Sequence, residues 1–350
     1  MEVLQSGWVS EGRLVKEFEG ALATRLGLRN SVAVNSGTSA LHLALSLAGI
    51  GPGDEVILPP QTFVATGMVI LMQGATPVYA DIQPKTGNID PKSIRAKITP
   101  RTKAIIPVHW GGYPCDLNEI QAIAEEHGPT VIEDAAHALG ATYRGKPVGD
   151  ISRFTAFSFQ AIKHLTTGDG GALCCCEEED YLRALRCRWF GIDRSNAKTT
   201  RLGVRDYEGI SELGYKYHMN DVAAAIGLGN LEGFETALQR RQAIGAIYRR
   251  KLAAVPGLSL LDCQNDRTHA YWIFTVIVER RDDFVRKMNE RGIPTSVVDL
   301  RIDRNPIFGG QRGDLVNQAW FNERQISIPL HNALTEADVD AVIEAIRSGW

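Results

Sequence analysis

The sequence predicts an α/β protein with a large domain, built on a mainly parallel sheet flanked by helices, and a smaller α+β domain at its C-terminal end. Three observations indicate this organisation. Short β-branched runs alternate with helix-like stretches through the first 180 residues, and the pattern changes after residue 230. The length of 350 residues exceeds the ~150 of an average domain. A content of 44% hydrophobic and 23% charged residues is typical of globular chains.

The expected elements of the first half alternate between strand and helix. Strands are expected at residues 31–35, 55–58, 76–82, 103–108, 130–133 and 155–159, and helices at residues 40–48, 62–73 and 116–127. Asp116 and Glu119 have the spacing of a capping box at the start of the last of these helices. Such alternation requires right-handed βαβ crossovers, which place parallel strands in one sheet with helices on both faces.

The second half has a different pattern, which predicts the smaller domain. A helical stretch at residues 221–255 ends at Pro256 and Gly257. Strands are expected at residues 258–261, 271–279 and 295–300, and helices at residues 282–291 and 334–347. Thr335 and Asp338 are spaced as a capping box for the last helix. We therefore expect two domains, at residues 1–230 and 231–350.

The charge balance argues against several classes of protein. Lysine and arginine number 38 and aspartate and glutamate 41, a net charge of −3. Nucleic-acid and anionic-membrane partners select a basic surface, so neither is expected. No run approaches the ~20 apolar residues of a membrane span, and the first residues lack the basic and apolar regions of a secretory signal.

The six cysteines indicate a cytoplasmic protein. Cys174, Cys175 and Cys176 are consecutive in an apolar run, and we expect them to be buried, reduced thiols of a strand. A zinc site uses spaced ligand pairs such as CxxC, which this sequence lacks, so no metal site is predicted.

The residues that follow each predicted strand are candidates for a site, because ligands of open parallel sheets lie beyond the carboxyl ends of the strands. Gly37 and Thr38 follow the first strand and open a helix, whose free N–H groups and dipole suit a phosphate. An ordinary capped turn has the same pattern. Asp134 and His137 follow the strand at residues 130–133, and both side chains can reach one ligand there. The alternative is that Asp134 caps a helix and that His137 is an ordinary surface histidine.

Lys163 lies between the predicted strand at residues 155–159 and the glycine-rich run at residues 166–171. An isolated lysine at this position would be expected to extend its amine into water. The nearby Ser158 and the glycine-rich run instead indicate that Lys163 belongs to a ligand-binding site. Pyridoxal phosphate (PLP) requires a lysine amine, a carboxylate for its pyridine nitrogen, donors for its phosphate and an apolar surface for its ring. The residues that supply these groups are Lys163, Asp134, Gly37 and Thr38 with Ser158, and Phe63.

The same residues stand in longer motifs that cover nearly the whole chain. These are Asn35-Ser-Gly-Thr-Ser-Ala-Leu-His-Leu-Ala, Gly53-Asp-Glu-Val-Ile, Gln61-Thr-Phe-Val-Ala-Thr, Ile106-Pro-Val-His-Trp-Gly-Gly-Tyr-Pro-Cys-Asp, Val131-Ile-Glu-Asp-Ala-Ala-His-Ala-Leu-Gly, Phe157-Ser-Phe-Gln-Ala-Ile-Lys, Thr166-Thr-Gly-Asp-Gly-Gly and Gly214-Tyr-Lys-Tyr-His-Met-Asn-Asp. Each motif alone is weak, but their succession is specific. The chain resembles the DegT/DnrJ/EryC1/StrS aminotransferases, which are sugar aminotransferases among the fold-type I PLP-dependent transferases.

The resemblance implies a role for each matching residue. Lys163 is implied as the Schiff-base lysine and proton shuttle, and Asp134 as the partner of the pyridine nitrogen. The other implied cofactor residues are Gly37, Thr38 and Ser158 at the phosphate, Phe63 on the ring face and His137 near the ring hydroxyl. Asn220 is implied at the phosphate of the neighbouring subunit, which predicts a homodimer with shared sites. His331 is implied near the substrate.

The reaction implied by the resemblance is transfer of an amino group from an amino acid, glutamate, to a keto-sugar linked to a nucleotide. Three alternatives remain open. The acceptor could be a cyclitol or another small ketone. Dehydratases of the family carry histidine at the lysine position, where this chain has Lys163 followed by His164. The third alternative is a non-catalytic regulatory protein with the same fold. Such a protein would not need the lysine, the aspartate and the phosphate loop, all of which this chain has.

Two features depart from the pattern of the family. Family members carry about twenty more residues before the Ser-Gly-Trp element, which starts here at Ser6, so part of the N-terminal cover at the dimer edge is expected to be missing. The arginine-rich stretches at residues 188–194 and 301–305 match no family-wide pattern. They are interpreted as exposed loop arginines, with contacts to an anionic nucleotide as the alternative.

Overall fold

The computed structural model describes every residue except 1, 195–197, 200, 202, 204 and 208. Its centre is a seven-stranded sheet. In spatial order the strands are β1 (Ser31–Val34), β9 (Gly171–Cys175), β8 (Phe154–Ser158), β5 (Thr130–Asp134), β4 (Thr102–Ile105), β2 (Glu55–Leu58) and β3 (Thr76–Tyr79). The strands predicted in the first half are all present, each within a few residues of its expected bounds.

The sheet is mainly parallel, as the sequence predicts. β8, β5, β4, β2 and β3 pair in parallel, whereas β9 runs antiparallel to both β1 and β8. The sequence predicts that the consecutive cysteines lie in a strand, which is β9, but it does not predict the antiparallel direction of that strand. β9 follows β8 through the glycine-rich run, a connection without a helix, which returns the chain beside the strand it has just left.

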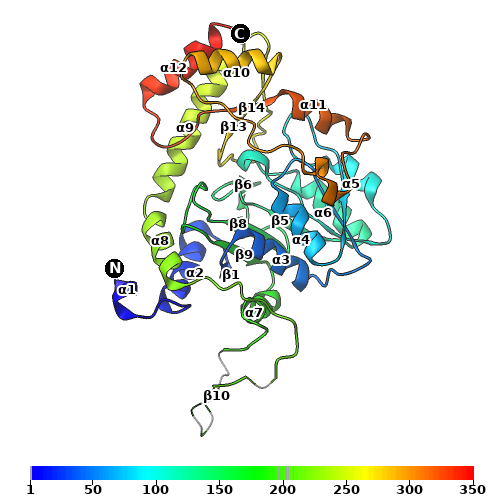
Figure 1. Ribbon diagram of the computed structural model, residues 1–350, viewed down its shortest axis with the longest axis vertical. Helices are drawn as coiled ribbons and strands as arrows, with labels where there is room; N and C mark the ends of the chain where they lie inside the picture. The colour runs from blue at the N-terminus through cyan, green and yellow to red at the C-terminus, as the bar shows by residue number, and fades with distance from the viewer. Residues whose placement is uncertain (1, 195–197, 200, 202, 204, 208) are drawn as a thin grey trace.

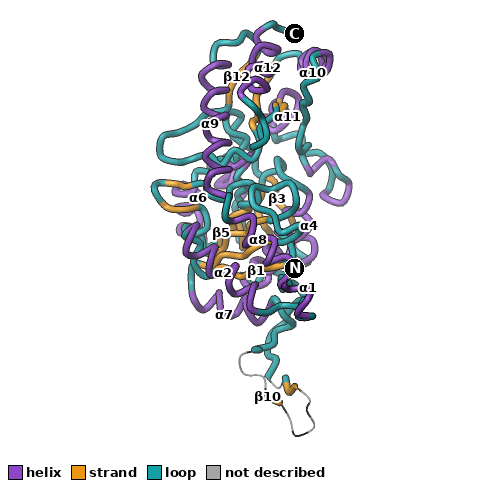
Figure 2. Tube along the Cα trace, turned by 90° about the vertical axis from the view of Figure 1, so that its left-hand side faces the viewer, coloured by secondary structure: helices purple, strands orange, loops and turns teal. Residues whose placement is uncertain are grey.

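Helices cover both faces of this sheet (Figures 1 and 2). They are α2 (Arg13–Leu26), α3 (Gly37–Leu47), α4 (Val64–Met72), α5 (Pro91–Lys97), α6 (Leu117–His127), α7 (Glu178–Cys187) and α8 (Asp221–Leu231). The short helix α1 (Glu2–Ser6) has no buried residue and contacts α8. Successive side chains of a strand point to opposite faces of the sheet, and in β2 they belong to two different hydrophobic clusters. Val56 packs with α3 and α4, whereas the next residue, Ile57, packs with α5 and α6. Both faces are therefore buried, as parallel sheets require.

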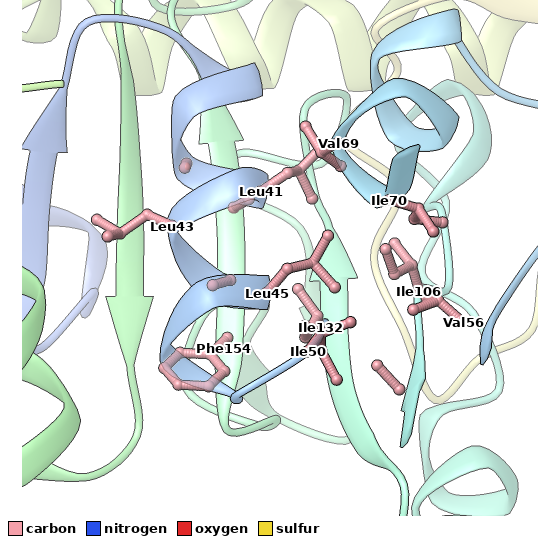
Figure 3. Packing of buried hydrophobic residues seen from close by; sticks show 14 of the residues in the cluster. Leu41, Leu43, Leu45, Ile50, Val56, Val69, Ile70, Ile106, Ile132 and Phe154 are labelled. Carbon is pink, nitrogen blue, oxygen red and sulfur yellow. The ribbon is translucent and has the colours of Figure 1, made fainter. Parts of the chain in front are cut away.

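The contact between α3 and the sheet fixes the start of α3. Leu41, Leu45 and Leu43 lie among side chains of the sheet and of α4 (Figure 3). A helix with eight buried positions cannot shift along its axis without leaving voids, which close-packed cores do not tolerate. Its first residue, Gly37, is thereby held at the carboxyl end of β1.

The C-terminal elements form a second layer above the large sheet (Figure 1). They are α9 (Phe234–Leu252), β12 (Leu258–Leu260), β13 (Phe274–Val278), α10 (Arg281–Glu290), α11 (Val316–Arg324), β14 (Gln325–Ile328) and α12 (Glu336–Arg347). The antiparallel strands β12, β13 and β14 share one hydrophobic cluster with α9, α10 and α12. The division of the chain at residue 230 stays a prediction.

The strand expected at residues 295–300 is wrong. Ser296 makes a single bridge to Ser327, and the third strand of the small sheet is β14. Beyond Ser296 the chain leaves the sheet, and the side-chain amides of Gln61 and Gln325 donate to the carbonyl of Asp299. Val297 packs against the cluster of the small sheet, whereas Leu300 is 40% exposed, so the apolar residues of this stretch do not form the buried face of a strand.

The two predicted capping boxes have different outcomes. At α12 the Thr335 hydroxyl accepts from the N–H of Asp338, and the Asp338 carboxylate accepts from the N–H of Thr335, as expected. At α6 the prediction is wrong, because the Asp116 side chain makes no cap hydrogen bond. Its carboxylate accepts instead from Gln83 and Arg267, and the stronger charge-assisted bond to arginine takes precedence over the helix end.

Several short elements complete the fold. They are β6 (Thr142–Tyr143), β7 (Lys146–Pro147), β10 (Lys198–Thr199), β11 (Arg205–Asp206) and the 3₁₀ turns at Trp110–Gly112, Ile302–Arg304 and Pro306–Phe308. All six cysteines are free thiols. Cys174 and Cys175 are buried as expected, but Cys176 is exposed, since it lies just beyond the end of β9. None of the described helices has the length and apolarity needed to cross a membrane.

Candidate functional site

A cavity of about 470 Å³ lies beyond the carboxyl ends of β1, β5 and β8. It brings together seven of the nine residues that the sequence singles out. These are Gly37, Thr38, Phe63, Asp134, His137, Ser158 and Lys163. Ligand cavities of open parallel sheets occur at this edge, and the volume is within the range of small-molecule sites.

Asp134 is the last residue of β5 and is almost fully buried. The Thr66 hydroxyl donates to its Oδ2 at 2.7 Å, and the N–H of Ala136 donates to its Oδ1 at 3.2 Å. Burial raises the pKa of Asp134, while the Thr66 bond and the charge of Lys163 oppose that rise. A carboxylate held in this way is oriented by its neighbours and is stabilised by any cation that enters the cavity.

Lys163 lies in the turn that follows β8, where its N–H donates to the carbonyl of Gln160. Its Nζ lies 3.7 Å from the ring centroid of Trp272. No hydrogen bond or ion pair joins this amine to another described residue. Burial lowers the pKa of Lys163 to about 8, against the opposing charges of Asp134 and Asp299. The amine is therefore partly neutral near neutral pH.

The start of α3 forms the wall opposite Lys163. Ser36 caps the helix by accepting from the N–H of Ser39. Gly37 and Thr38 occupy the first turn, where N–H groups have no partners within the helix. A Cβ on Gly37 would lie 2.9 Å from the Cβ of Ser158, so only glycine lets the helix start approach the end of β8 this closely.

Phe63 and His137 differ in their exposure. Phe63 precedes α4 and is 59% exposed, with its side chain on the cavity wall. His137 is buried, and burial holds its pKa well below the usual value, so its ring is neutral. Its Nδ1 has no hydrogen-bond partner among the described residues. A buried nitrogen without a partner costs free energy that a ligand can relieve.

The structure does not bring Asn220 or His331 to this cavity. Asn220 caps α8, where its side-chain oxygen accepts from the N–H of Ala223, and it is exposed. His331 is exposed beyond β14 and is not among the residues that line the cavity. The implied role of His331 beside the substrate gains no support from this geometry.

The interpretation of both arginine-rich stretches is wrong for their first arginines, which are buried. Arg188 donates to Glu11, Glu19 and the carbonyl of Ala33. Arg301 makes two hydrogen bonds of 2.6 Å to the buried carboxylate of Asp303. Both guanidinium groups are buried and paired with carboxylates of this chain, although Nη1 of Arg301 has no partner among the described residues, so neither arginine is an exposed loop side chain.

Sequence reasoning missed the side chains that the second half of the chain contributes to the cavity, among them Trp272 and Asp299. Trp272 lies just before β13. Asp299 is a partly buried carboxylate, and its burial raises its pKa above the usual value. Both residues come from the second half of the chain and follow no strand of the large sheet. Only their proximity to Lys163 in space distinguishes them, so a search beyond the ends of predicted parallel strands could not find them.

The comparison with known protein families decides the assignment. A model of the DegT/DnrJ/EryC1/StrS aminotransferase family matches residues 1–347. The chain belongs to this family. The predicted family, the predicted fold class and the predicted enzyme class, a PLP-dependent aminotransferase, are therefore confirmed.

Individual relatives agree with this assignment. The chain is 41% identical to the spore coat polysaccharide biosynthesis protein SpsC of Bacillus subtilis, over 99% of this chain and 92% of that protein. The sugar aminotransferase CalS13 of Micromonospora echinospora superposes with a TM-score of 0.94 at 39% identity, over 99% of this chain and 95% of that one. The PLP-form of Spr1654 from Streptococcus pneumoniae has a TM-score of 0.89 at 30% identity, over 99% and 93% of the two chains.

Proposed function

We propose that this enzyme moves an amino group from glutamate to a keto-sugar carried on a nucleotide, with PLP as its cofactor. The observation that carries the proposal is the meeting of Lys163 and Asp134 in one cavity with the start of α3. The family supplies the class of acceptor, because its members are sugar aminotransferases. Glutamate and the nucleotide are the finer parts of the proposal, which the experiment below tests.

The residues of the cavity fit the cofactor group by group. Asp134 offers a buried carboxylate for a protonated ring nitrogen, and His137 offers its unpartnered Nδ1 for a ring hydroxyl. The first turn of α3 and Ser158 provide N–H and hydroxyl donors for a phosphate. Phe63, largely exposed on the cavity wall, offers an apolar face that a ring can cover.

Lys163 carries the proton in both halves of the proposed reaction. When bound, PLP supplies an electron sink that stabilises the negative charge left on a substrate carbon when its proton departs. The Lys163 Nζ accepts that proton and returns it on the other side of the transferred nitrogen. A general base works best with a pKa near the working pH, and burial brings the pKa of Lys163 to about 8.

A panel of substrates tests the proposed acceptor and donor. Purified enzyme with PLP and glutamate is incubated separately with nucleotide-linked 3-keto and 4-keto sugars, free keto-sugars and a cyclitol ketone, and products are read by mass. We expect an amino product from one nucleotide-linked class, together with 2-oxoglutarate. If free sugars or the cyclitol ketone are aminated at the same rate as the nucleotide-linked sugars, the proposed nucleotide requirement is wrong. If product forms only with amino acids other than glutamate, the proposed amino donor is wrong.

We further propose a homodimer in which Asn220 of the partner subunit completes the phosphate site. Lys163 is the only cation among the described residues that line the cavity, which also include Asp134, Asp169 and Asp299. A doubly charged phosphate and the carboxylates of glutamate need further donors than this lining provides. Asn220 is exposed, and its amide nitrogen has no hydrogen bond to a described residue.

Mixed dimers test this shared site. Asn220→Asp keeps the oxygen that caps α8 but replaces the amide donor with a charge that repels phosphate, so the variant should be nearly inactive at limiting PLP. Mixing it with Lys163→Ala chains should restore activity toward about a quarter of wild type, since half of the dimers are mixed and each has one intact site. Asn220→Ser keeps a residue that can cap the helix but adds no charge, and it serves as the matched control. Confirmed exchange by mass without recovery of activity would show that Asn220 acts within its own chain.

A further inference from the structure

The contact of Lys163 with Trp272 is a feature of the cavity that the proposed roles leave unused. The indole lies between two groups of the site. The His137 ring stacks on it with 3.7 Å between centroids and 13° between planes, and the Lys163 Nζ lies 3.7 Å from the same centroid. Two groups at these distances cannot share one face of a ring, so His137 and Lys163 lie on opposite faces of Trp272.

Trp272 is fixed in this position by several hydrogen bonds. Its indole N–H donates to the carbonyl of Ile162, one residue before Lys163, and its backbone N–H donates to the carbonyl of Gly111. His164 Nε2 is 2.9 Å from the carbonyl of Ala270, two residues before Trp272. The residues on either side of Lys163 are thus tied to the segment that carries the indole, so the indole keeps a fixed position relative to the backbone of Lys163.

The backbone of this segment is held in an unusual conformation. Tyr271, directly before Trp272, has a positive φ of 53°, which is rare for a bulky residue and persists only where the surroundings impose it. A Cβ on Gly112 would lie 2.5 Å from the carbonyl of His137, so a glycine is required where this segment packs on the large sheet. Such features concentrate at functional sites.

We propose that Trp272 is a positioning residue for the reaction: its indole face holds the Lys163 amine in one place whenever that amine is not bonded to the cofactor. The inference rests on the proposed role of Lys163. An aromatic face attracts the ammonium form but accepts no proton, unlike a carboxylate. It therefore fixes the position of the amine while leaving its lone pair free once the proton has moved.

None of the charged or titratable side chains around the Lys163 amine contacts it as the Trp272 indole does, among the described residues. Asp134 and Asp299 both act on Lys163 electrostatically, without an ion pair to it among the described residues. His137 and His164 are buried, and burial lowers the pKa of both, to about 3 for His164. Both histidines are therefore neutral near neutral pH, and the indole is the group in contact with the amine.

The first test measures Lys163 in the cofactor-free protein. The rate at which an acylating reagent labels Lys163 is followed against pH by mass, which gives the pKa of the amine. Trp272→Phe should leave this pKa near that of wild type. Trp272→Leu, which keeps an apolar wall without an aromatic face, should lower the pKa by about half a unit or more, because the ammonium form loses its partner. Phe63→Leu, in the same cavity, should not change it.

A second variant tests the same contact without changing the shape of the side chain, so the test still holds if Trp272→Leu misfolds. Tetrafluorotryptophan at position 272 keeps the shape and the N–H of the indole but depletes the electron density of its face. The pKa of Lys163 should fall in the same direction as in Trp272→Leu. A wild-type pKa in this variant overturns the inference.

The second test separates positioning of the amine from contact with a substrate. Single-turnover rates are measured for the glutamate half and for the keto-sugar half. Lys163 serves both halves, so Trp272→Leu should slow both by a similar factor of about five to ten. Slowing of one half alone overturns the inference and makes Trp272 a substrate contact. Activity in Lys163→Ala would contradict the proposed function, whereas an unaffected Trp272→Leu contradicts only the role of Trp272.

Discussion

Replacement of Lys163 by alanine is expected to abolish transamination. The buried amine is the proposed proton carrier in both halves of the reaction, and no other described lysine lines the cavity. The contacts proposed for the phosphate and the ring involve other side chains, so the variant should still bind PLP but should lack the visible absorbance of its bond to lysine. Product formation is measured by mass, and cofactor content by absorbance after denaturation.

Two controls separate loss of the amine from loss of the fold. Lys103→Ala removes an exposed lysine and should leave activity unchanged. A small primary alkylamine added to Lys163→Ala can enter the space that the side chain has left and should restore a part of the rate. Turnover at the wild-type rate in Lys163→Ala without added amine would refute the role of this lysine.

Asp134→Asn is expected to reduce the rate by about 10²–10³-fold, because it removes a preorganised charge from the position proposed to face the ring nitrogen. The amide has the same shape, and its oxygen can still accept from the Thr66 hydroxyl, which bonds to Asp134 at 2.7 Å. The fold is therefore expected to persist. Rates are measured at saturating PLP so that loss of cofactor does not contribute.

Thr66→Val is the matched control for Asp134→Asn. It removes the hydroxyl donor but keeps the carboxylate, so the pKa of Asp134 rises further and a rate loss of about tenfold or less is expected. If Asp134→Asn retains a rate within about twofold of wild type, Asp134 has a structural role only.

Most elements of the large sheet could be predicted because their signals are local. The strand at residues 55–58 has the predicted bounds, since a short β-branched run between turn residues needs no distant contact to be recognised. The strand expected at residues 295–300 is wrong because the chain leaves the small sheet after Ser296 and its carbonyl at Asp299 accepts from Gln61, and a short apolar run has the same composition in either case.

Polar partners far apart in the chain explain the other errors. Asp116 has the spacing of a helix cap, but Arg267 takes its carboxylate at 2.7 Å. Arg188 is charged and follows a helix, yet it is buried against Glu11 and Glu19, which lie 177 and 169 positions earlier in the chain. A charged side chain is exposed unless a partner compensates for its burial, and no local pattern in the sequence reveals where such partners meet.

The sequence by itself determined the family, the mainly parallel sheet, and the residues that follow its strands. Lys163, Asp134 and the start of α3 could be selected because the carboxyl ends of parallel strands meet at one edge of a sheet. Only the tertiary structure decided what completes the cavity. Trp272 bonds to the segment of Lys163 from 110 positions further along the chain, and contacts over such separations depend on how two layers pack, which the order of elements does not specify.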